Sequence, residues 1–366
     1  MFCCSNCFVD EDIKSIIESH NKKGTCDFCG CHDTFVYDIE KNTTITELFE
    51  PLLDIYTPIS RLPHNFHRKH TKQLKSILHD DWNIFSPDVD AIKLITSLCV
   101  DRYSDQPELF DTPIGIPEIQ SSEYMEAHSI LKGYEWADFD IGIKTKNRFH
   151  SDFINTDELD FFLQYVVETY RKEQKPPKQM YRSRICPNKK GFNPSEMGAP
   201  PKHMAKDGRV NPVGISVLYL ANAEKTTLHE VRATLYDFIT IGTFELQKDI
   251  RIINLSRLDK ISPSLLTPNE FDLTEYAINL PHLKRIALEI AKPLRNANVL
   301  EYLPTQYICD FIRSRGYDGI EYNSTMHEGG VNLAVFEPDV FKCTETKVCE
   351  ISRIDYEHKL YRGDLH

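Results

Sequence analysis

Three clusters of polar side chains in the second half of the chain have the residue types that an active site uses. They are Tyr181-Arg182-Ser183-Arg184, the segment from Gly208 to Arg232, and the segment from Tyr317 to Leu333. In the second cluster, Arg209 lies in a loop bounded by Gly and Pro, Tyr219 ends a strand-like run, and Glu230 lies in a helical stretch. A guanidinium donates two parallel hydrogen bonds to phosphate oxygens, so Arg209 suits a diphosphate.

The spacing within this cluster allows a carboxylate and an aromatic ring to approach one cleft from adjacent elements. It also allows a simpler alternative, in which Arg209 is a surface residue, Tyr219 packs in a core and Glu230 faces solvent. His229 precedes Glu230, but consecutive helical residues point about 100° apart, so we do not expect the two to act as an acid–base pair.

A second kind of chemistry is indicated by cysteines near the N-terminus. Two Cys-x-x-Cys pairs flank a short acidic helical stretch, a spacing typical of tetrahedral zinc sites. We assign the zinc ligands as Cys4, Cys7, Cys26 and Cys29. The neighbours Cys3, Cys31 and His32 are near enough to substitute for one of them. Four protein ligands leave no open position, so we expect a structural zinc that holds together a segment too small to fold alone.

Composition limits the class of protein. A chain of 366 residues is long enough for two or three domains. The net charge of −12 argues against a protein that coats nucleic acid, because neutralising phosphates requires an excess of Lys and Arg. No run reaches the ~18 apolar residues of a membrane helix, and the N-terminus lacks a secretion signal. The cysteines outside the N-terminal group are scattered, as in reduced cytosolic chains, so we place the protein in the cytoplasm.

The elements that position these residues divide the chain into four expected parts. They are a zinc-binding knuckle over 1–35, a mainly helical domain over 36–175, a mixed domain over 179–345 and a tail over 346–366. Asn155 and Glu158 resemble a capping box at the start of a helix, and Lys172–Lys178 is typical of a linker because it contains two prolines.

The expected mixed domain alternates between strand and helix signals. Short apolar runs predict strands at 217–220, 250–253, 319–322 and 333–336, and periodicity predicts helices at 224–233, 275–291 and 305–315. Gly316 is expected to cap the last helix in a left-handed conformation. Strands and helices without strict alternation indicate an α+β fold.

The ordered clusters resemble the RES domain, a family of NAD-consuming toxins from bacterial toxin–antitoxin systems. The matching motifs and residues are Tyr181-Arg182, Gly208 to Gly214, Leu218 to Ala221, Glu230, and Asp318 to Ser324. The N-terminal zinc knuckles followed by helices also resemble the HEPN-like extension of some family members. Within the helical part, Arg61 to His67 has the R-x-x-x-x-x-H spacing of HEPN ribonucleases, but Pro63 argues against the helix that this motif requires.

The resemblance implies an ADP-ribosyltransferase-like fold and cleavage of the nicotinamide–ribose bond of NAD by hydrolysis or phosphorolysis. It implies that Arg209 and either Arg182 or Arg184 hold the diphosphate, and that Tyr219 stacks on the nicotinamide or its ribose. Glu230 would bind the ribose, and Ser324 would fix that carboxylate or the ribose hydroxyls. It also implies an antitoxin partner, and a homo-oligomer is possible.

Two other functions remain open from the sequence. The same cleft would serve an ADP-ribosyltransferase that modifies a macromolecule. A different class would be a zinc-bearing module that recognises nucleic acid or a partner without catalysis. The acidic balance of the chain disfavours nucleic acid.

Overall fold

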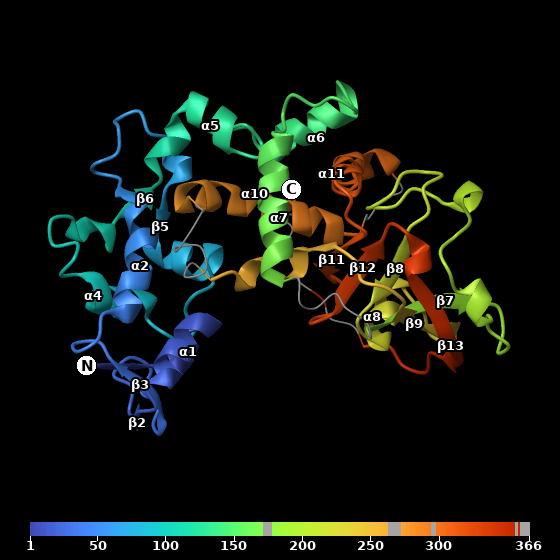
Figure 1. Cartoon of the computed structure of the whole chain (residues 1–366), viewed down its shortest axis with the longest axis horizontal. Helices are drawn as coiled ribbons and strands as arrows, with labels where there is room; N and C mark the ends of the chain where they lie inside the picture. Colours follow the sequence, from blue (N-terminus) through green and yellow to red (C-terminus); the bar gives the residue numbers. More distant parts are fainter. Residues whose placement is uncertain (171–177, 263–271, 294–297, 356–357, 359–366) are drawn as a thin grey trace, which may run out of the picture. The chain divides into compact units, whose positions relative to one another are not determined.

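The structure is a computed structural model, and its description covers residues 1–170, 178–262, 272–293, 298–355 and 358. The chain divides into two compact units (Figure 1). Unit 1 comprises Met1–Phe162 and Arg257–Ile286, and unit 2 comprises Leu163–Ser256 and Ala287–His366. The expected linker falls outside the described residues except for Lys178.

Unit 1 is mainly helical and also contains two small sheets. Its helices are α1 (Glu11–Ser19), α2 (Thr44–Asp54), α3 (Leu74–Ser76), α4 (Ala91–Cys99), α5 (Ser122–His128), α6 (Trp136–Thr145) and the first parts of α7 (Thr156–Tyr170) and α10 (Leu273–Ala291). One antiparallel sheet has the order β1 (Phe2–Cys4), β3 (Thr34–Asp38), β2 (Lys23–Gly24). The other has the order β4 (Thr57–Pro58), β6 (Pro113–Gly115), β5 (Lys72–Gln73).

Local capping explains where several of these helices begin. The Asp10 carboxylate accepts hydrogen bonds from the backbone N–H groups of Asp12 and Ile13 at the start of α1. Asn155 accepts from Asp157 and Glu158 at the start of α7, at the position where the sequence predicts a cap. These side chains satisfy backbone donors that have no partner within the first helical turn.

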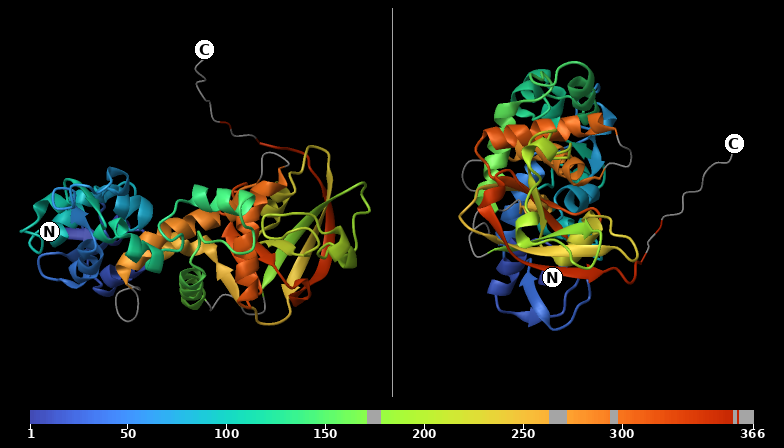
Figure 2. Two further views of the ribbon diagram at one scale, coloured as in Figure 1. Left: turned by 90° about the horizontal axis from the view of Figure 1, so that it is seen from above. Right: turned by 90° about the vertical axis from the view of Figure 1, so that its right-hand side faces the viewer.

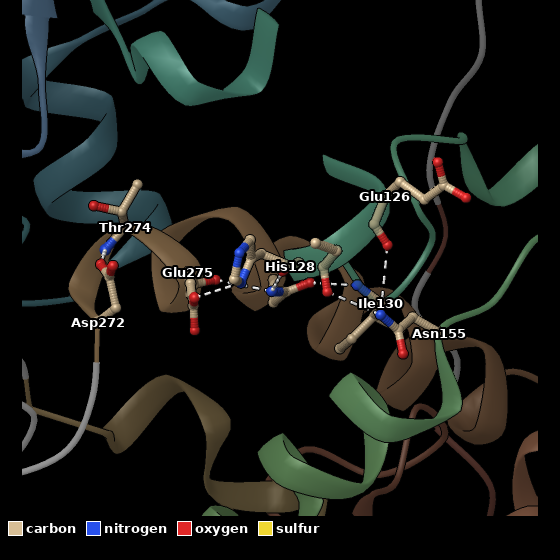
Figure 3. A network of polar contacts seen from close by, with 9 residues as sticks. Glu126, His128, Ile130, Asn155, Asp272, Thr274 and Glu275 are labelled. Carbon is tan, nitrogen blue, oxygen red and sulfur yellow. Dashed lines mark hydrogen bonds and ion pairs between the residues drawn. The ribbon is translucent and has the colours of Figure 1, made fainter. Parts of the chain in front are cut away.

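A polar network joins α10 to the segment around α5 within unit 1 (Figure 3). His128 Nδ1 lies 2.6 Å from Glu275 Oε1, and the two side chains face each other in Figure 3. The buried Asn279 side chain donates to the His128 carbonyl at 2.7 Å and accepts from the Ile130 N–H at 2.7 Å. Asn155 donates to the Ala127 carbonyl at 3.0 Å. These contacts explain why the first part of α10 belongs to unit 1.

Unit 2 is built around a seven-stranded sheet. The strands are β7 (Gln179–Cys186), β8 (Leu218–Ala221), β9 (Phe238–Leu246), β10 (Ile252–Asn254), β11 (Gly319–Asn323), β12 (Val331–Val335) and β13 (Phe341–Glu350). Their order is β10-β11-β12-β8-β7-β9-β13, and only the β10–β11 pair is parallel. The long strands β9 and β13 run side by side (Figure 2). The helices of this unit include α8 (Glu224–Glu230) and α11 (Leu303–Ser314).

The two faces of this sheet have different roles. One face carries the main apolar core, which includes Met180, Leu220, Phe244, Leu333 and Val335. On the other face, strand register aligns Tyr322 of β11, Asn332 of β12, Ala221 of β8 and Tyr181 of β7 in one row. Successive residues of a strand point to opposite faces, so the residues of this row point away from the apolar core and can line a site.

The fold class is confirmed as α+β, but several predicted boundaries require correction. The predicted boundary at residue 35 falls inside β3, which pairs with β1, so the cysteine segment shares a sheet with residues 34–38. The predicted tail from residue 346 begins inside β13. This edge strand is rich in polar and charged residues and therefore lacks an apolar run. The predicted helix 224–233 ends at Glu230, and Arg232 adopts a left-handed conformation with φ 53°.

The remaining predicted elements lie close to those in the structure. Gly316 has φ 81°, as expected for a left-handed cap after α11. Residues 61–67 form turns rather than a helix, in agreement with the argument from Pro63. Within the described part of the chain, no helix combines the length and apolar character needed to cross a membrane.

Candidate active site

A cavity of about 510 Å³ in unit 2 lies over the polar row of the sheet. Its lining includes Tyr181, Arg182, Ser183, Gly208, Arg209, Asn211, Tyr219, Ala221, Glu230, Tyr302, Tyr322 and Asn332. The whole row of Tyr322, Asn332, Ala221 and Tyr181 is among these residues, so four strands form the floor. The volume is typical of small-molecule sites, which measure roughly 300–1,000 Å³.

The carboxylate of Glu230 is held by three donors at this cavity. Its Oε1 accepts hydrogen bonds from Ser324 Oγ and Asn332 Nδ2, each at 2.8 Å. Its Oε2 lies 3.3 Å from Arg209 Nη2. Glu230 is the last residue of α8, where the helix dipole disfavours a negative charge. The three donors offset that cost and fix the carboxylate in one orientation.

Arg209 is anchored on its other side by the end of a helix. Its Nη1 donates to the carbonyl of Ala291, the last residue of α10, where the helix dipole favours a cation. Thr325 Oγ1 donates to the same carbonyl at 3.1 Å. Burial alone would lower the pKa of Arg209, but the nearby Tyr322 and Glu230 outweigh burial and raise it. Arg209 therefore remains a fixed cation beside the carboxylate.

The loop that carries Arg209 is held by Asn211 and by a close glycine contact. Buried Asn211 donates through Nδ2 to the carbonyls of Lys206 and Ile215, both at 2.9 Å, and its Oδ1 accepts from Tyr219 OH at 2.7 Å. A Cβ at Gly208 would lie 2.8 Å from that hydroxyl and 2.7 Å from Asn211 Oδ1. The motif glycine is therefore needed for the loop to approach the strand.

The structure distinguishes between the two candidate arginines of β7. Arg182 lines the cavity, and its buried Nη1 has no hydrogen-bond partner among the described residues. Burial, together with Arg184, lowers the pKa of Arg182 to about 10. Arg184 instead donates to the Glu196 carbonyl and stacks on Phe192, with its guanidinium carbon 4.3 Å from the ring centroid. Arg182 is the better placed of the two to receive an anion.

The site brings together residues that the sequence nominated and residues that it did not. Arg209, Tyr219 and Glu230 all line the cavity, and Ser324 reaches Glu230 from the segment after β11. Asn332 and Tyr322 lie in the third sequence cluster, but only strand register places them opposite each other and near Glu230. Gln306 of α11 donates to the Gly208 carbonyl at 2.9 Å, a contact for which the sequence holds no signal.

Residues 180–356 match the family model of the RES domain. These residues are similar to the RES domain, and this segment is called the RES domain below. The match covers β7 to β13 and runs past residue 345, in agreement with the continuation of β13. No curated protein matches the chain in sequence.

One similar solved structure is titled "Crystal structure of the M.tuberculosis MbcT-MbcA toxin-antitoxin complex". The matched chain shares 13% sequence identity with this chain, with a TM-score of 0.30. The similar region covers 49% of this chain and 86% of that chain.

His229 of the RES domain takes no part in the cavity lining. Its ring stacks on His327 with the ring centroids 5.1 Å apart, and His327 Nδ1 lies 2.9 Å from Thr226 Oγ1. Burial and the neighbouring His327 lower the pKa of His229. This arrangement agrees with the expectation that His229 and Glu230 face different directions.

The four predicted zinc ligands meet in unit 1. The Sγ atoms of Cys4, Cys7, Cys26 and Cys29 all lie within 4.8 Å of one another. Three measured separations are 3.4, 3.5 and 3.7 Å. A tetrahedral zinc with Zn–S bonds of about 2.3 Å requires S–S edges of about 3.8 Å, so the cluster fits this ion. The backbone N–H groups of Phe28 and Cys29 point at Cys26 Sγ, which would stabilise a thiolate there.

Proposed function

We propose that the RES domain binds NAD in the 510 Å³ cavity and cleaves the bond between nicotinamide and ribose. The observation that carries this proposal is the Glu230 carboxylate, which Arg209, Ser324 and Asn332 hold in a fixed position at the cavity wall. The resemblance to a family of NAD-consuming enzymes and the ordered motif residues support the choice of ligand.

The chemistry requires stabilisation of positive charge rather than a strong acid. As the C1′–N bond breaks, its electron pair leaves with the nicotinamide nitrogen, which becomes neutral. The ribose then develops oxocarbenium character at C1′, the kind of charge that glycosidases stabilise with carboxylates. Glu230 would face this carbon, and a nucleophile would add to C1′ to complete the reaction. A fixed anion in a sheltered site is effective because it needs no reorganisation during the reaction.

The cations of the site would hold the diphosphate. Both Nη atoms of Arg209 are already engaged by protein groups, whereas Arg182 presents a buried Nη1 with no partner among the described residues. We therefore assign the principal diphosphate contact to Arg182 and a supporting role to Arg209. Tyr219, fixed through Asn211, would pack against the nicotinamide or its ribose.

The proposal is tested by incubating the purified full chain with NAD and measuring nicotinamide by chromatography. Nicotinamide should accumulate with turnover, and the Glu230→Gln variant should lose most of this activity. An unchanged NAD pool at high protein concentration, with the protein shown to be folded, would contradict the proposal.

The acceptor of the ADP-ribosyl group is identified in the same reaction with labelled NAD. Hydrolysis yields free ADP-ribose, and phosphorolysis yields ADP-ribose 1″-phosphate only when inorganic phosphate is present. Transfer to a macromolecule leaves label on protein or nucleic acid of an added lysate. We place hydrolysis or phosphorolysis first, because the resemblance is to toxins that degrade NAD, and transfer second.

The biological role that we propose is that of a toxin restrained by an antitoxin. Depletion of NAD would arrest growth, and a partner that covers the cavity would prevent it. Expression of the chain alone should reduce cellular NAD and colony formation, and the Glu230→Gln variant should do neither. Equal toxicity of the two proteins would contradict this role.

In unit 1, we propose that the cysteine cluster binds one structural zinc. All four positions of the ion would be filled by thiolates, so it would stabilise the fold rather than take part in the reaction. Metal analysis of the purified protein should give about one zinc per chain, and Cys26→Ser should abolish it.

A further inference from the structure

A second cavity, of about 270 Å³, lies entirely within unit 1. It is bounded by the segment after α2, by β6, by α5 and by the first part of α10. Apolar side chains form much of its wall, including Ile77, Ile114, Ile116, Ile119 and Ile278. A ligand with an apolar body would therefore gain from entering it.

The four charged side chains at this cavity form two ion pairs, so their charges sum to zero. Lys69 lies 3.1 Å from Glu135, and Lys72 lies 2.7 Å from Asp81. Outside these two pairs, burial and Lys69 lower the pKa of His70, so its imidazole is neutral near pH 7. A charged ligand would have to break one of the two ion pairs or remain without a partner of opposite charge. An uncharged ligand would contact a cavity wall with no net charge.

Polar groups inside the cavity provide both donors and acceptors. His282 lines the cavity, and its side chain is partly exposed there. Burial of the imidazole lowers its pKa to about 4. A neutral imidazole has one donor and one acceptor nitrogen, and Nε2 of His282 already lies 3.4 Å from Ser129 Oγ, so a ligand would meet Nδ1. Tyr56 OH accepts from Trp82 Nε1 at 3.1 Å, which leaves the hydroxyl proton of Tyr56 to donate. Burial raises the pKa of Tyr56, so this proton is retained.

Helix α10 contributes a further acceptor because it contains a proline. Pro281 has no N–H and cannot donate the helical hydrogen bond to the carbonyl of Ala277, four residues earlier. Both residues line the cavity. A ligand with an N–H group would supply the donor that this carbonyl lacks within the helix.

We propose that this cavity is a binding site for a small uncharged ring compound that carries both hydrogen-bond donors and acceptors, such as an aromatic amide or a nucleobase. The apolar wall would contact the ring, and Tyr56, Ala277 and His282 would bind its polar edge. This site lies in unit 1 and is independent of the reaction proposed for the RES domain.

The test is calorimetric titration of the full chain with three probes: nicotinamide, adenine and nicotinate. Nicotinate has the shape of nicotinamide but carries a carboxylate, so it isolates the effect of charge. We expect saturable binding of nicotinamide or adenine and at least about tenfold weaker binding of nicotinate, as expected when a charge must be buried unpaired. Absence of saturable binding for both neutral probes, or equal binding of nicotinate, would overturn the proposal.

Variants locate the bound probe. Ile119→Trp should fill the cavity and abolish binding, whereas Ile141→Trp, the same change at an exposed position of α6, should leave it unchanged. If Ile119→Trp does not fold, His282→Leu removes the polar contact and should weaken binding about tenfold, the cost of one buried hydrogen bond to the ligand. Arg209→Ala should retain the binding that Ile119→Trp removes, because that binding does not involve the cavity of the RES domain. Binding that survives in the cavity variants or disappears in Arg209→Ala would overturn the assignment.

Discussion

Replacement of Glu230 by glutamine removes a charge with little change in shape. In the native site, Oε1 accepts from Ser324 Oγ and Asn332 Nδ2, and Oε2 faces Arg209. In Glu230→Gln, the amide oxygen can accept the hydrogen bonds that one of the two carboxylate oxygens accepts in the native protein. The amide nitrogen then faces the donors of the other carboxylate oxygen. We expect a folded protein whose cavity keeps its volume but has lost the anion opposite the reacting carbon.

The size of the effect is set by Coulomb's law. Two unit charges about 4 Å apart interact by about 4 kcal/mol at an effective dielectric constant of 20. Arg209, 3.3 Å from the carboxylate, cancels part of this attraction. We therefore expect kcat to fall by about 10²–10³, the range observed when one well-placed electrostatic group is removed. The KM for NAD should change by less than about fivefold, because the charge acts mainly in the transition state.

The assay is steady-state release of nicotinamide at saturating NAD, with thermal unfolding as a check on the fold. Glu224→Gln is the matched control, since Glu224 begins the same helix but forms an exposed ion pair with Lys347. This control should retain nearly full activity. A Glu230→Gln protein with normal kcat, or one whose loss lies wholly in KM, would refute the electrostatic role.

Three further predictions address other parts of the chain. Arg182→Ala should raise the KM for NAD by about 10–100-fold, which corresponds to the loss of one or two charge-assisted hydrogen bonds. Arg184→Ala should change the KM by less than about threefold. Equal effects of the two substitutions in initial-rate assays would contradict the assignment of the diphosphate contact to Arg182. Chelation of zinc, or Cys26→Ser, should lower the unfolding temperature by several degrees in scanning calorimetry, and an unchanged transition would argue against a structural ion. His282 has a folded pKa of about 4, below its unfolded value, so protonation favours the unfolded chain and stability should be lost as pH falls from about 6.5 to 4. Urea titrations should show His282→Gln losing up to about 3 kcal/mol less over this range than the native protein, and parallel pH profiles would refute the argument.

The sequence predicted the central residues of the candidate site because these residues lie in recognisable sequence motifs. Arg209, Glu230 and Ser324 were expected to lie close together, and in the structure both Arg209 and Ser324 contact Glu230. The RES resemblance is confirmed by the family match. Asn332 was not assigned a role, because its contact with Glu230 spans 102 positions and depends on the register of β12. Amino-acid spacing alone does not encode such a contact.

Other residues were misplaced or left ambiguous because their positions depend on contacts that the sequence does not show. Arg182 and Arg184 are two positions apart on one strand, so alternation places them on the same face and cannot separate them. In the structure, Arg184 contacts Phe192 and Glu196 in the following loop, whereas Arg182 lines the cavity. The assignment of α10 to the C-terminal domain overlooked buried Asn279, whose hydrogen bonds to His128 and Ile130 hold the start of this helix in unit 1.

The most direct test of the proposed reaction is a crystal structure of the Glu230→Gln variant with NAD. We predict that the dinucleotide lies in the RES-domain cavity, with its diphosphate on Arg182 and the C1′ atom of the nicotinamide ribose in contact with the residue 230 side chain. A dinucleotide bound elsewhere, or bound there with the nicotinamide ribose turned away from residue 230, would contradict the proposed role of Glu230.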